Sequence, residues 1–332
     1  MYDAAPHTAV PKQVSFRATS RAPGSAIIQR LMRALSTAVI VALLALASTH
    51  VAAQGGRPTQ APDEFRRMLA MGTKYRAASE FYAALKAAAP GGGRQMPAFA
   101  QLPDWTGLWM ASGGGNFASS GPGGVAPKLT TAAQAAVKQG ADNQTKGIEY
   151  DENLSQCGPP GYPRWLVIPF LREFIVRPEE TWLTSETVNN VRRIYTDGRD
   201  HPPAEERYPL YYGDSIGFWD GPKLVIHTNQ LMERSMGRNQ PTQSDKMETV
   251  EIWQSVNATT VKADVWIFDP AIYTEPWYIQ RIYTKVPNED KSLRIRYWNC
   301  NENPNNDVLK TPDGSTNYKD FTFDDKPKEP AK

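Results

Sequence analysis

From Arg164 onward, short runs of alternating apolar and polar residues follow one another along the chain. Between residues 261 and 267, for example, the odd positions are Val, Ala, Val and Ile, and Lys and Asp stand between them. Such alternation predicts strands with one buried face. Turn sequences such as Asp220-Gly221 separate neighbouring runs and predict hairpins. We therefore expect a mainly β domain over residues 102–323.

About ten strands without helical crossovers close most readily into a barrel. We expect an antiparallel meander that closes as a barrel or as a strongly curled sheet, and a β-sandwich is the alternative. The runs predicted to pair include "ETVEIWQSV" with "TVKADVWIF", and "WYIQRIYTKV" with "LRIRYWNC". A shorter strand is expected from Trp105 to Ala111.

Helical periodicity is confined to two stretches of the chain. Residues 61–89 carry apolar side chains at spacings of three and four, with Gly72 as a point where the helix divides. Together with the Gly-rich residues that follow, they predict a helical arm and linker over 54–101. Residues 128–140 predict a short helix with Thr130 as N-cap and Gly140 as its end.

The period of two also assigns polar residues to strand faces. In the run 223–229, Val225, His227 and Asn229 share one face, and Leu224, Ile226 and Thr228 share the other. Glu248 and Glu251 stand three apart in the next run, so they point to opposite faces. An inward Glu251 is a candidate general base.

The N-terminal region predicts export. From Met32, a basic residue precedes an apolar stretch, Ala38–Ala47, and the small residues Val51 and Ala53 precede Gln54. This order is typical of a signal peptide, and the apolar stretch is short for a membrane span. We expect residues 1–53 to be removed, with Met32 as a possible true start; a retained anchor is the alternative. The mature protein is then periplasmic or secreted, without a stable membrane span.

Composition and cysteine content fit this compartment. The formal net charge of the 332 residues is only +2, which gives no basic field for nucleic acid. In an oxidising compartment the two cysteines, Cys157 and Cys300, are expected to form a disulfide, with two buried thiols or a reactive thiol as alternatives. The charged, proline-containing residues 324–332 predict a disordered tail.

The densest polar cluster spans residues 195–221. Asp197-Gly198 predicts a turn, after which Arg199, Asp200 and His201 project from a segment stiffened by two prolines. A histidine beside a carboxylate can act as a general acid or base, and Arg199 can orient an anionic group. The structural alternative is a surface turn in which Arg199 pairs with Asp197.

Aromatic residues are the candidates for a ligand pocket. Trp219, Trp253 and Trp277 lie in or beside predicted strands, and an aromatic-walled barrel mouth suits a hydrophobic or aromatic small molecule. His227 and Asp197 are further candidate ligand-binding residues. The alternative is that all these side chains only fill the core.

Other chemistry is not supported by residue spacing. Neither His-x-His, His-Glu-x-x-His nor Cys-x-x-Cys is present, so we expect no metal and no cofactor. The Gly-rich stretch at 113–124 has no phosphate-binding lysine. The sequence Gly213-Asp214-Ser215-Ile216-Gly217 has the letters of a nucleophile elbow, but a predicted hairpin follows where an elbow needs a helix.

Four segments together resemble a large family of secreted, mostly uncharacterised bacterial proteins: "RRIYTDGRDHP", "GDSIGFWDGPKLVIHT", "FDPAIYTEPW" and "CNEN". The similarity covers about residues 150–303. It implies that one shared framework contains Asp197, Gly198, Arg199, His201, Gly217, Trp219, Pro276 and Trp277. Two positions depart from the family pattern, because His227 replaces an acidic residue and Ile252 replaces an arginine. Separately, Gly107-Leu108-Trp109 is similar to the Gly-x-Trp of lipocalins.

Two functions follow as hypotheses. The first is an exported protein that binds a hydrophobic or aromatic small molecule in an aromatic-lined barrel. The alternative is a cofactor-independent lyase, isomerase or hydrolase that uses His201, a carboxylate such as Asp200 or Glu251, and Arg199.

Overall fold

A computed structural model describes residues 62–112, 117, 126–146, 157–237 and 240–298, and the backbone of two short strands at 308–310 and 316–318. These residues belong to the unit Arg57–Lys332. The predicted signal segment, Cys300 and the predicted tail lie outside the described residues. Among the described helices, none has the length and apolar character that a membrane span requires.

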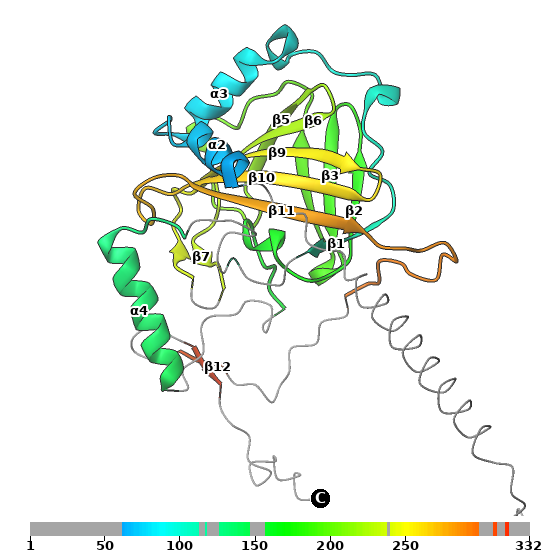
Figure 1. Cartoon of the computed structure of the whole chain (residues 1–332). Coiled ribbons are helices and arrows are strands. Elements are labelled where there is room, and N and C mark those ends of the chain that lie inside the picture. Colours follow the sequence, from blue (N-terminus) through cyan, green and yellow to red (C-terminus); the bar gives the residue numbers. More distant parts are fainter. Residues whose placement is uncertain are drawn as a thin grey trace, which may run out of the picture. The chain divides into compact units, whose positions relative to one another are not determined.

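Nine strands form a closed barrel, in the order β1-β11-β10-β9-β6-β5-β4-β3-β2 (Figure 1). The predicted barrel is therefore confirmed. Its strands are β1 (Leu108–Ser112), β2 (Arg172–Val176), β3 (Glu180–Ser185), β4 (Asn190–Tyr195), β5 (Asp214–Asp220), β6 (Lys223–Asn229), β9 (Glu248–Asn257), β10 (Thr260–Phe268) and β11 (Trp277–Lys285). Two separate pairs are β7 (Arg234–Ser235) with β8 (Thr242–Gln243), and β12 (Val308–Lys310) with β13 (Thr316–Tyr318).

The predicted hairpins β5–β6 and β9–β10 are present, and Asp220-Gly221 forms the first of these turns. The expectation of a purely antiparallel barrel is wrong at one place. Strands β4 and β5 are parallel, with Tyr195 opposite Ile216. A parallel pair needs a connection that brings the chain back before the second strand starts. This connection, residues 196–213, carries His201.

Strand β1 closes the barrel by pairing with β11 on one side and with β2 on the other. The register places Trp109 opposite Lys285 and Leu108 opposite Glu173. The predicted strand at 293–300 is wrong for its described residues, because Leu293–Trp298 is not in a strand. The edge of β11 that such a strand would need is already paired with β1.

The described helices are α2 (Pro62–Gly72), α3 (Ala78–Ala88) and α4 (Thr131–Thr145), and the short 3-10 turns are η1 (Pro90–Gly93), η2 (Phe99–Gln101), η5 (Arg164–Leu166), η6 (Thr187–Asn189) and η7 (Ala204–Glu206). The predicted division at Gly72 is confirmed. Thr130 caps α4, since its hydroxyl accepts a hydrogen bond from the amide of Ala133 at 3.2 Å. The predicted end at Gly140 is wrong: α4 continues to Thr145, and Lys138 pairs with Asp142 across this glycine at 2.7 Å.

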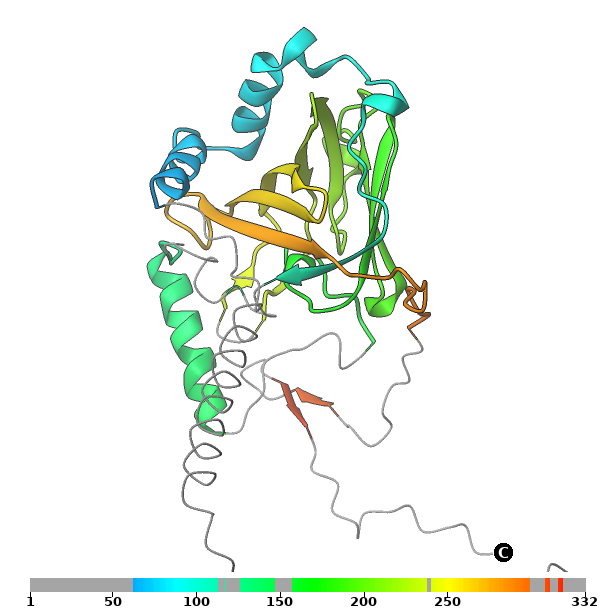
Figure 2. The same cartoon turned by 45° about the vertical axis from the view of Figure 1, so that its right-hand side comes forward.

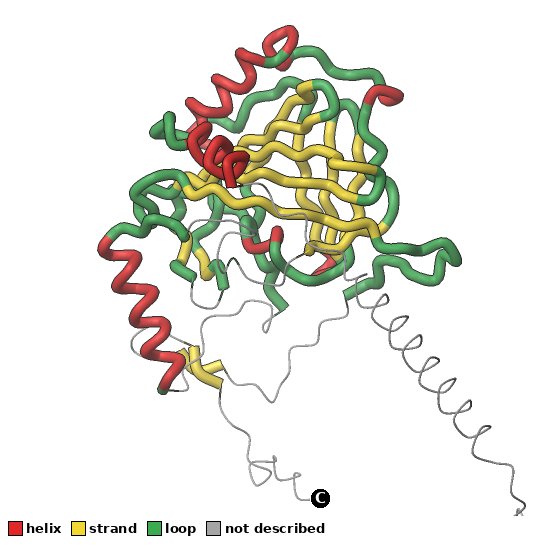
Figure 3. Tube along the Cα trace, in the orientation of Figure 1, coloured by secondary structure: helices red, strands yellow, loops and turns green. Residues whose placement is uncertain are grey.

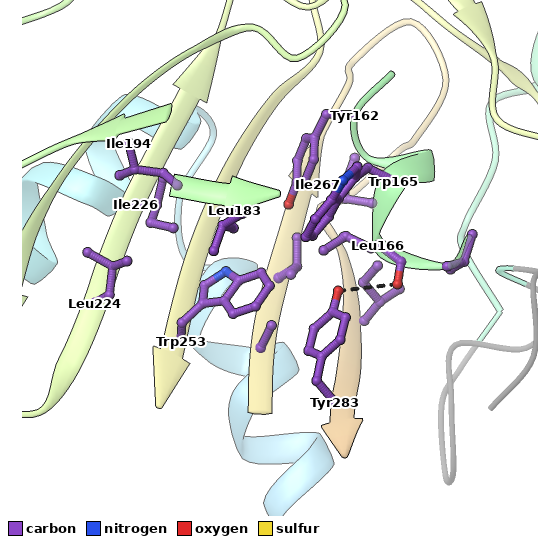
Figure 4. Packing of buried hydrophobic residues seen from close by; sticks show 14 of the residues in the cluster. Tyr162, Trp165, Leu166, Leu183, Ile194, Leu224, Ile226, Trp253, Ile267 and Tyr283 are labelled. Atoms are coloured by element: carbon purple, nitrogen blue, oxygen red, sulfur yellow. Dashed lines mark hydrogen bonds between the residues drawn. The ribbon is translucent and has the colours of Figure 1, made fainter. Parts of the chain in front are cut away.

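The barrel wall separates two clusters of buried side chains. The inner core lies inside the barrel and includes Trp105, Trp253 and Tyr283. Figure 4 shows part of it, with Tyr283 hydrogen-bonded to the carbonyl oxygen of Leu166 at 3.2 Å. The outer cluster lies between the wall and helices α2 and α3, whose Phe65 and Phe81 contact Tyr278 and Trp266. Figures 2 and 3 show these helices outside the strands.

Candidate functional site

Strands β5, β6 and β9 lie side by side and carry polar residues on both faces of the wall. Leu224 and Ile226 belong to the inner core, whereas Val225 belongs to the outer cluster, so the predicted division of β6 is confirmed. The same alternation directs Glu251 into the barrel and Glu248 to the outside. The wall therefore has an inner and an outer polar site.

The inner site is an ion pair between Arg192 of β4 and Glu251 of β9. Arg192 Nη2 lies 2.5 Å from Glu251 Oε1, and Nη1 donates to Oε2 at 3.0 Å. The side chains are 1% and 0% exposed. A forked guanidinium–carboxylate contact of this kind is strong and fixes the relative orientation of both groups.

Other side chains complete the hydrogen bonds of this pair. Arg192 donates to the hydroxyl groups of Thr228 at 2.7 Å and Ser215 at 3.2 Å. Glu251 accepts from the indole of Trp253 at 2.8 Å. We call Arg192 and Glu251 the inner pair, and Thr228, Ser215 and Trp253 its partners. Because its charges are compensated and hydrogen-bonded, its burial inside the barrel is tolerated.

The electrostatics of the inner site keep Arg192 charged. Burial is the largest single effect and lowers the pKa of Arg192, but Glu251 and Tyr162 together raise this pKa above its ordinary value. Tyr162 lies under the guanidinium, whose central carbon is 3.9 Å from the ring centre. Burial, and then the charge of Glu251, raises the pKa of Tyr162 well above its usual range, so this phenol stays neutral.

The three predicted pocket tryptophans all belong to the inner core, but they do not form one wall. Trp219 and Trp253 both approach Trp105, at ring distances of 6.1 and 6.4 Å. Trp277 lies on β11 opposite Ile267 and packs against Tyr273 at 5.5 Å instead. Trp253 also stacks on Tyr283 at 5.1 Å.

Some indole groups of the inner core lack a hydrogen-bond partner. The buried N–H groups of Trp165, Trp219 and Trp277 find no acceptor among the described residues. Buried donors in folded proteins are nearly always satisfied by protein, by water or by a ligand.

The outer site is a continuous series of hydrogen bonds among Asp214, His201, His227 and Glu248, which we call the outer row. His201 Nδ1 lies 2.5 Å from Asp214 Oδ1, and His201 Nε2 lies 2.8 Å from His227 Nδ1. His227 Nε2 lies 3.2 Å from Glu248 Oε2. Asp214, His227 and Glu248 occupy neighbouring strands, and the 196–213 connection brings His201 to them.

Helix α3 covers part of the outer row. The ring of Tyr82 stacks on His227 at 5.4 Å with an interplanar angle of 25°. Burial, followed by the charge of Asp200, raises the pKa of Tyr82. The helical arm thus contributes to this site instead of standing free of the barrel.

The remaining predicted site residues lie apart from His201. Arg199 folds back onto Asp197 with a hydrogen bond of 2.6 Å, and both side chains are substantially exposed, at 53% and 32%. Asp200 is exposed at the surface. Glu251 is on the other face of the wall. The structure therefore brings His201 to Asp214 and His227, and it does not bring together the set of His201, Asp200, Arg199 and Glu251.

Several residues of these two sites were not predicted as such from the sequence. Asp214 and Ser215 were considered only as part of a nucleophile elbow, and Arg192 was not considered, although the alternation of the run 190–195 places Arg192 on the same face as the apolar Ile194. An arginine at an apolar-face position is a usable signal of a buried ion pair. Nothing local in the sequence marks the contact between Asp214 and His201.

No group of three or more His, Cys, Asp and Glu side chains in the described part of the chain is arranged to hold a metal ion. The described residues contain no free cysteine. The pairing of Cys157 with Cys300 stays a prediction, because Cys300 lies outside the described residues. A comparison of the chain with protein-family models and with curated proteins finds no match.

Proposed function

We propose that this protein binds a hydrophobic or aromatic small molecule inside its barrel. A closed barrel with buried aromatic clusters fits ligand binding. The observation that carries the proposal is the set of unpartnered indole N–H groups at Trp165, Trp219 and Trp277 within the inner core. Aromatic walls supply affinity for an apolar molecule, and these donors supply a small number of polar contacts that orient it.

Native mass spectrometry of the protein as it is purified tests this proposal first. The expected spectrum contains a species heavier than the polypeptide that loses a discrete mass when the protein is unfolded. Titration with the neutral aromatic dye N-phenyl-1-naphthylamine provides a second measurement, with an expected stoichiometry of one. A spectrum of bare polypeptide together with no dye binding would contradict the proposal.

Conservative variants locate the binding. Trp219→Phe keeps the ring contact with Trp105 but removes one N–H donor, so a ligand that accepts a hydrogen bond is expected to bind about tenfold more weakly. Trp182→Phe is the matched control, because Trp182 is on the outer face, where the guanidinium of Arg193 lies 4.3 Å from its ring centre. Equal weakening by both variants would place the ligand elsewhere.

Export and the disulfide belong to the same proposal. The signal-like N-terminus and the cysteine pair support a periplasmic or secreted protein in which Cys157 and Cys300 are joined. N-terminal sequencing of exported protein is expected to begin at Gln54. A thiol assay on the unreduced, denatured protein is expected to find no thiols, and two thiols per chain would disprove the disulfide.

Catalysis by His201 is the second candidate, and its contact with the Asp214 carboxylate favours it. A carboxylate that holds an imidazole in one orientation is a common arrangement for general acid–base chemistry. The ligand identified by mass spectrometry is incubated with the wild type and with His201→Ala. Turnover that is lost in a folded His201→Ala supports an enzyme, whereas a wild type that returns the ligand unchanged supports binding alone.

A further inference from the structure

A pocket of about 250 Å³ opens at the end of the barrel where β6 ends and β9 begins. Its walls come from Arg207 and Tyr208 of the 196–213 connection, from residues 229–231 and from residues 245–248. Glu248 lines this pocket and is also the last member of the outer row. This volume is below the roughly 300–1,000 Å³ of typical ligand pockets, so it suits a molecule smaller than a typical drug.

The pocket lining carries two charges of each sign that do not neutralise one another. Arg207 and Lys246 are cationic, and Asp245 and Glu248 are anionic. Within the described part of the chain, the ion pair of Glu248 with His227 is the only one that includes any of these four residues. A lining with balanced but unpaired charges complements a small molecule that bears both a positive and a negative group.

The outer row behind Glu248 holds a definite number of protons. Its three hydrogen bonds each need one proton, and with both carboxylates ionised all three protons must sit on the two imidazoles. Two protons then belong to one ring and one to the other, so the pair of rings carries a single positive charge. If one of these three protons is lost, one of the three contacts has two acceptor atoms facing each other with no proton between them.

We propose that this pocket binds a small zwitterion of amino-acid size, with its ammonium group at Glu248 and its carboxylate toward Arg207 and Lys246, and that the outer row releases a proton as the molecule binds. The proton leaves the histidine pair for solvent, because the ammonium group of the ligand replaces the imidazolium as the positive partner of Glu248. This site is separate from the proposed binding at Trp165, Trp219 and Trp277, since none of these three residues lines the pocket.

The charged and titratable groups around the histidine pair are compatible with this exchange. Asp214 and Glu248 face it from the strands, and Tyr82 faces it from α3, with Lys86 6.0 Å from the centre of the Tyr82 ring. In the 196–213 connection, the charge of Asp200 acts on Tyr82, and the charge of Asp214 acts on Arg199. The imidazolium therefore has carboxylates at both ends, of which only Glu248 is shared with the pocket.

Isothermal titration calorimetry of the full chain at pH 7 with L-alanine and L-glutamine tests the proposal. Phosphate and Tris buffers differ in ionisation enthalpy, so a released proton makes the observed heat depend on the buffer. We expect millimolar binding and release of up to about one proton. N-acetyl-L-glutamine lacks the ammonium group and L-glutaminamide lacks the carboxylate, so each is expected to bind at least about tenfold more weakly.

Variants separate binding from proton release. Glu248→Gln is expected to weaken amino-acid binding by about tenfold, whereas Asp220→Asn, at the opposite end of β5, leaves it unchanged. His227→Phe removes the imidazole partner of Glu248 and is expected to lose the buffer dependence of the heat. The proposal is overturned if neither amino acid binds at about 10 mM, if Glu248→Gln binds like the wild type, or if the wild type gives the same heat in both buffers.

Discussion

Arg192 and Glu251 meet inside the barrel with side chains that are 1% and 0% exposed, whereas on the outside of the same wall His227 meets a Glu248 that is 33% exposed. Both contacts join a cation-forming group to a carboxylate, and both involve strand β9. The two contacts differ in the cation-forming group, which is an arginine inside and a histidine outside, and in how far water reaches the carboxylate. An arginine keeps its proton at any physiological pH, but a histidine exchanges its proton near neutrality.

The difference separates a structural role from a chemical one. The inner pair is a forked contact that is hydrogen-bonded to Thr228, Ser215 and Trp253 and packed against the ring of Tyr162. In the outer row, a hydrogen bond joins the two imidazole rings, and Glu248 connects the row to a pocket. We infer that the inner pair holds strands β4 and β9 together, whereas the outer row is the polar group that borders the pocket.

Removal of Arg192 is the strongest way to break the inner site. Arg192→Met leaves Glu251 buried without its cation, and we expect the free energy of unfolding to fall by about 3–5 kcal/mol in urea titrations. The neighbouring Arg193→Met, on the outer face of β4, is the control, with an expected change below about 0.5 kcal/mol. The double variant Arg192→Met/Glu251→Gln is expected to recover part of the loss; no recovery would argue against an unpaired charge as the cause.

Gly217 tests how tightly the inner face is packed. A Cβ atom on this residue would lie 2.6 Å from the backbone oxygen of Val225 on β6. We expect Gly217→Ala to lower the free energy of unfolding by about 1–3 kcal/mol. Gly140→Ala is the matched control, because a Cβ there meets nothing within 4 Å and α4 should gain about 0.5–1 kcal/mol. Equal effects at the two positions would contradict close packing.

His227→Phe interrupts the outer row and keeps an aromatic ring against Tyr82. Two hydrogen bonds are lost, but Glu248 and the 196–213 connection remain accessible to water, which replaces part of them. We expect the free energy of unfolding to fall by about 1 kcal/mol, well below the effect of Arg192→Met. A loss as large as that of Arg192→Met would show that the outer row is as important to stability as the inner pair.

The exposed pair of Asp197 and Arg199 gives the smallest expected effect. Hydrogen bonds from Arg199 lower the pKa of Asp197, so the ionised form stabilises the fold above the unfolded-state pKa of about 3.9 and loses this contribution as the pH falls through the lower folded-state pKa. Because both side chains are exposed to solvent, Asp197→Asn should cost less than about 1 kcal/mol at pH 7. The difference from wild type should vanish at strongly acidic pH.

Alternation along single strands was the most informative part of the sequence. It grouped His227 with Val225 on one face of its strand and separated Glu248 from Glu251 on the next, and it predicted the hairpin at Asp220-Gly221 within a barrel or strongly curled sheet. These features depend on neighbouring residues, since side chains in a strand alternate in direction whatever the strand pairs with.

Features that depend on distant segments could not be predicted in this way. His201 meets Asp214 and His227 only because β4 and β5 run parallel and the connection between them returns across the end of the sheet. The nearest carboxylate in sequence, Asp200, is exposed instead. Likewise, the strand predicted after β11 needs a free edge of β11, but β1 already pairs with this edge.

Closure by β1 has a consequence for the order in which the chain folds. Trp109 pairs opposite Lys285, so the contact that seals the barrel joins residues from nearly the two extremes of the β domain. During synthesis the N-terminal part of the chain is made first, so one edge of β1 has no partner until β11 has been made. Sealing therefore occurs after synthesis of the domain, and contacts so distant in sequence make folding slow. A product that stops before Trp277 leaves the edges of β1 and β10 open to aggregation.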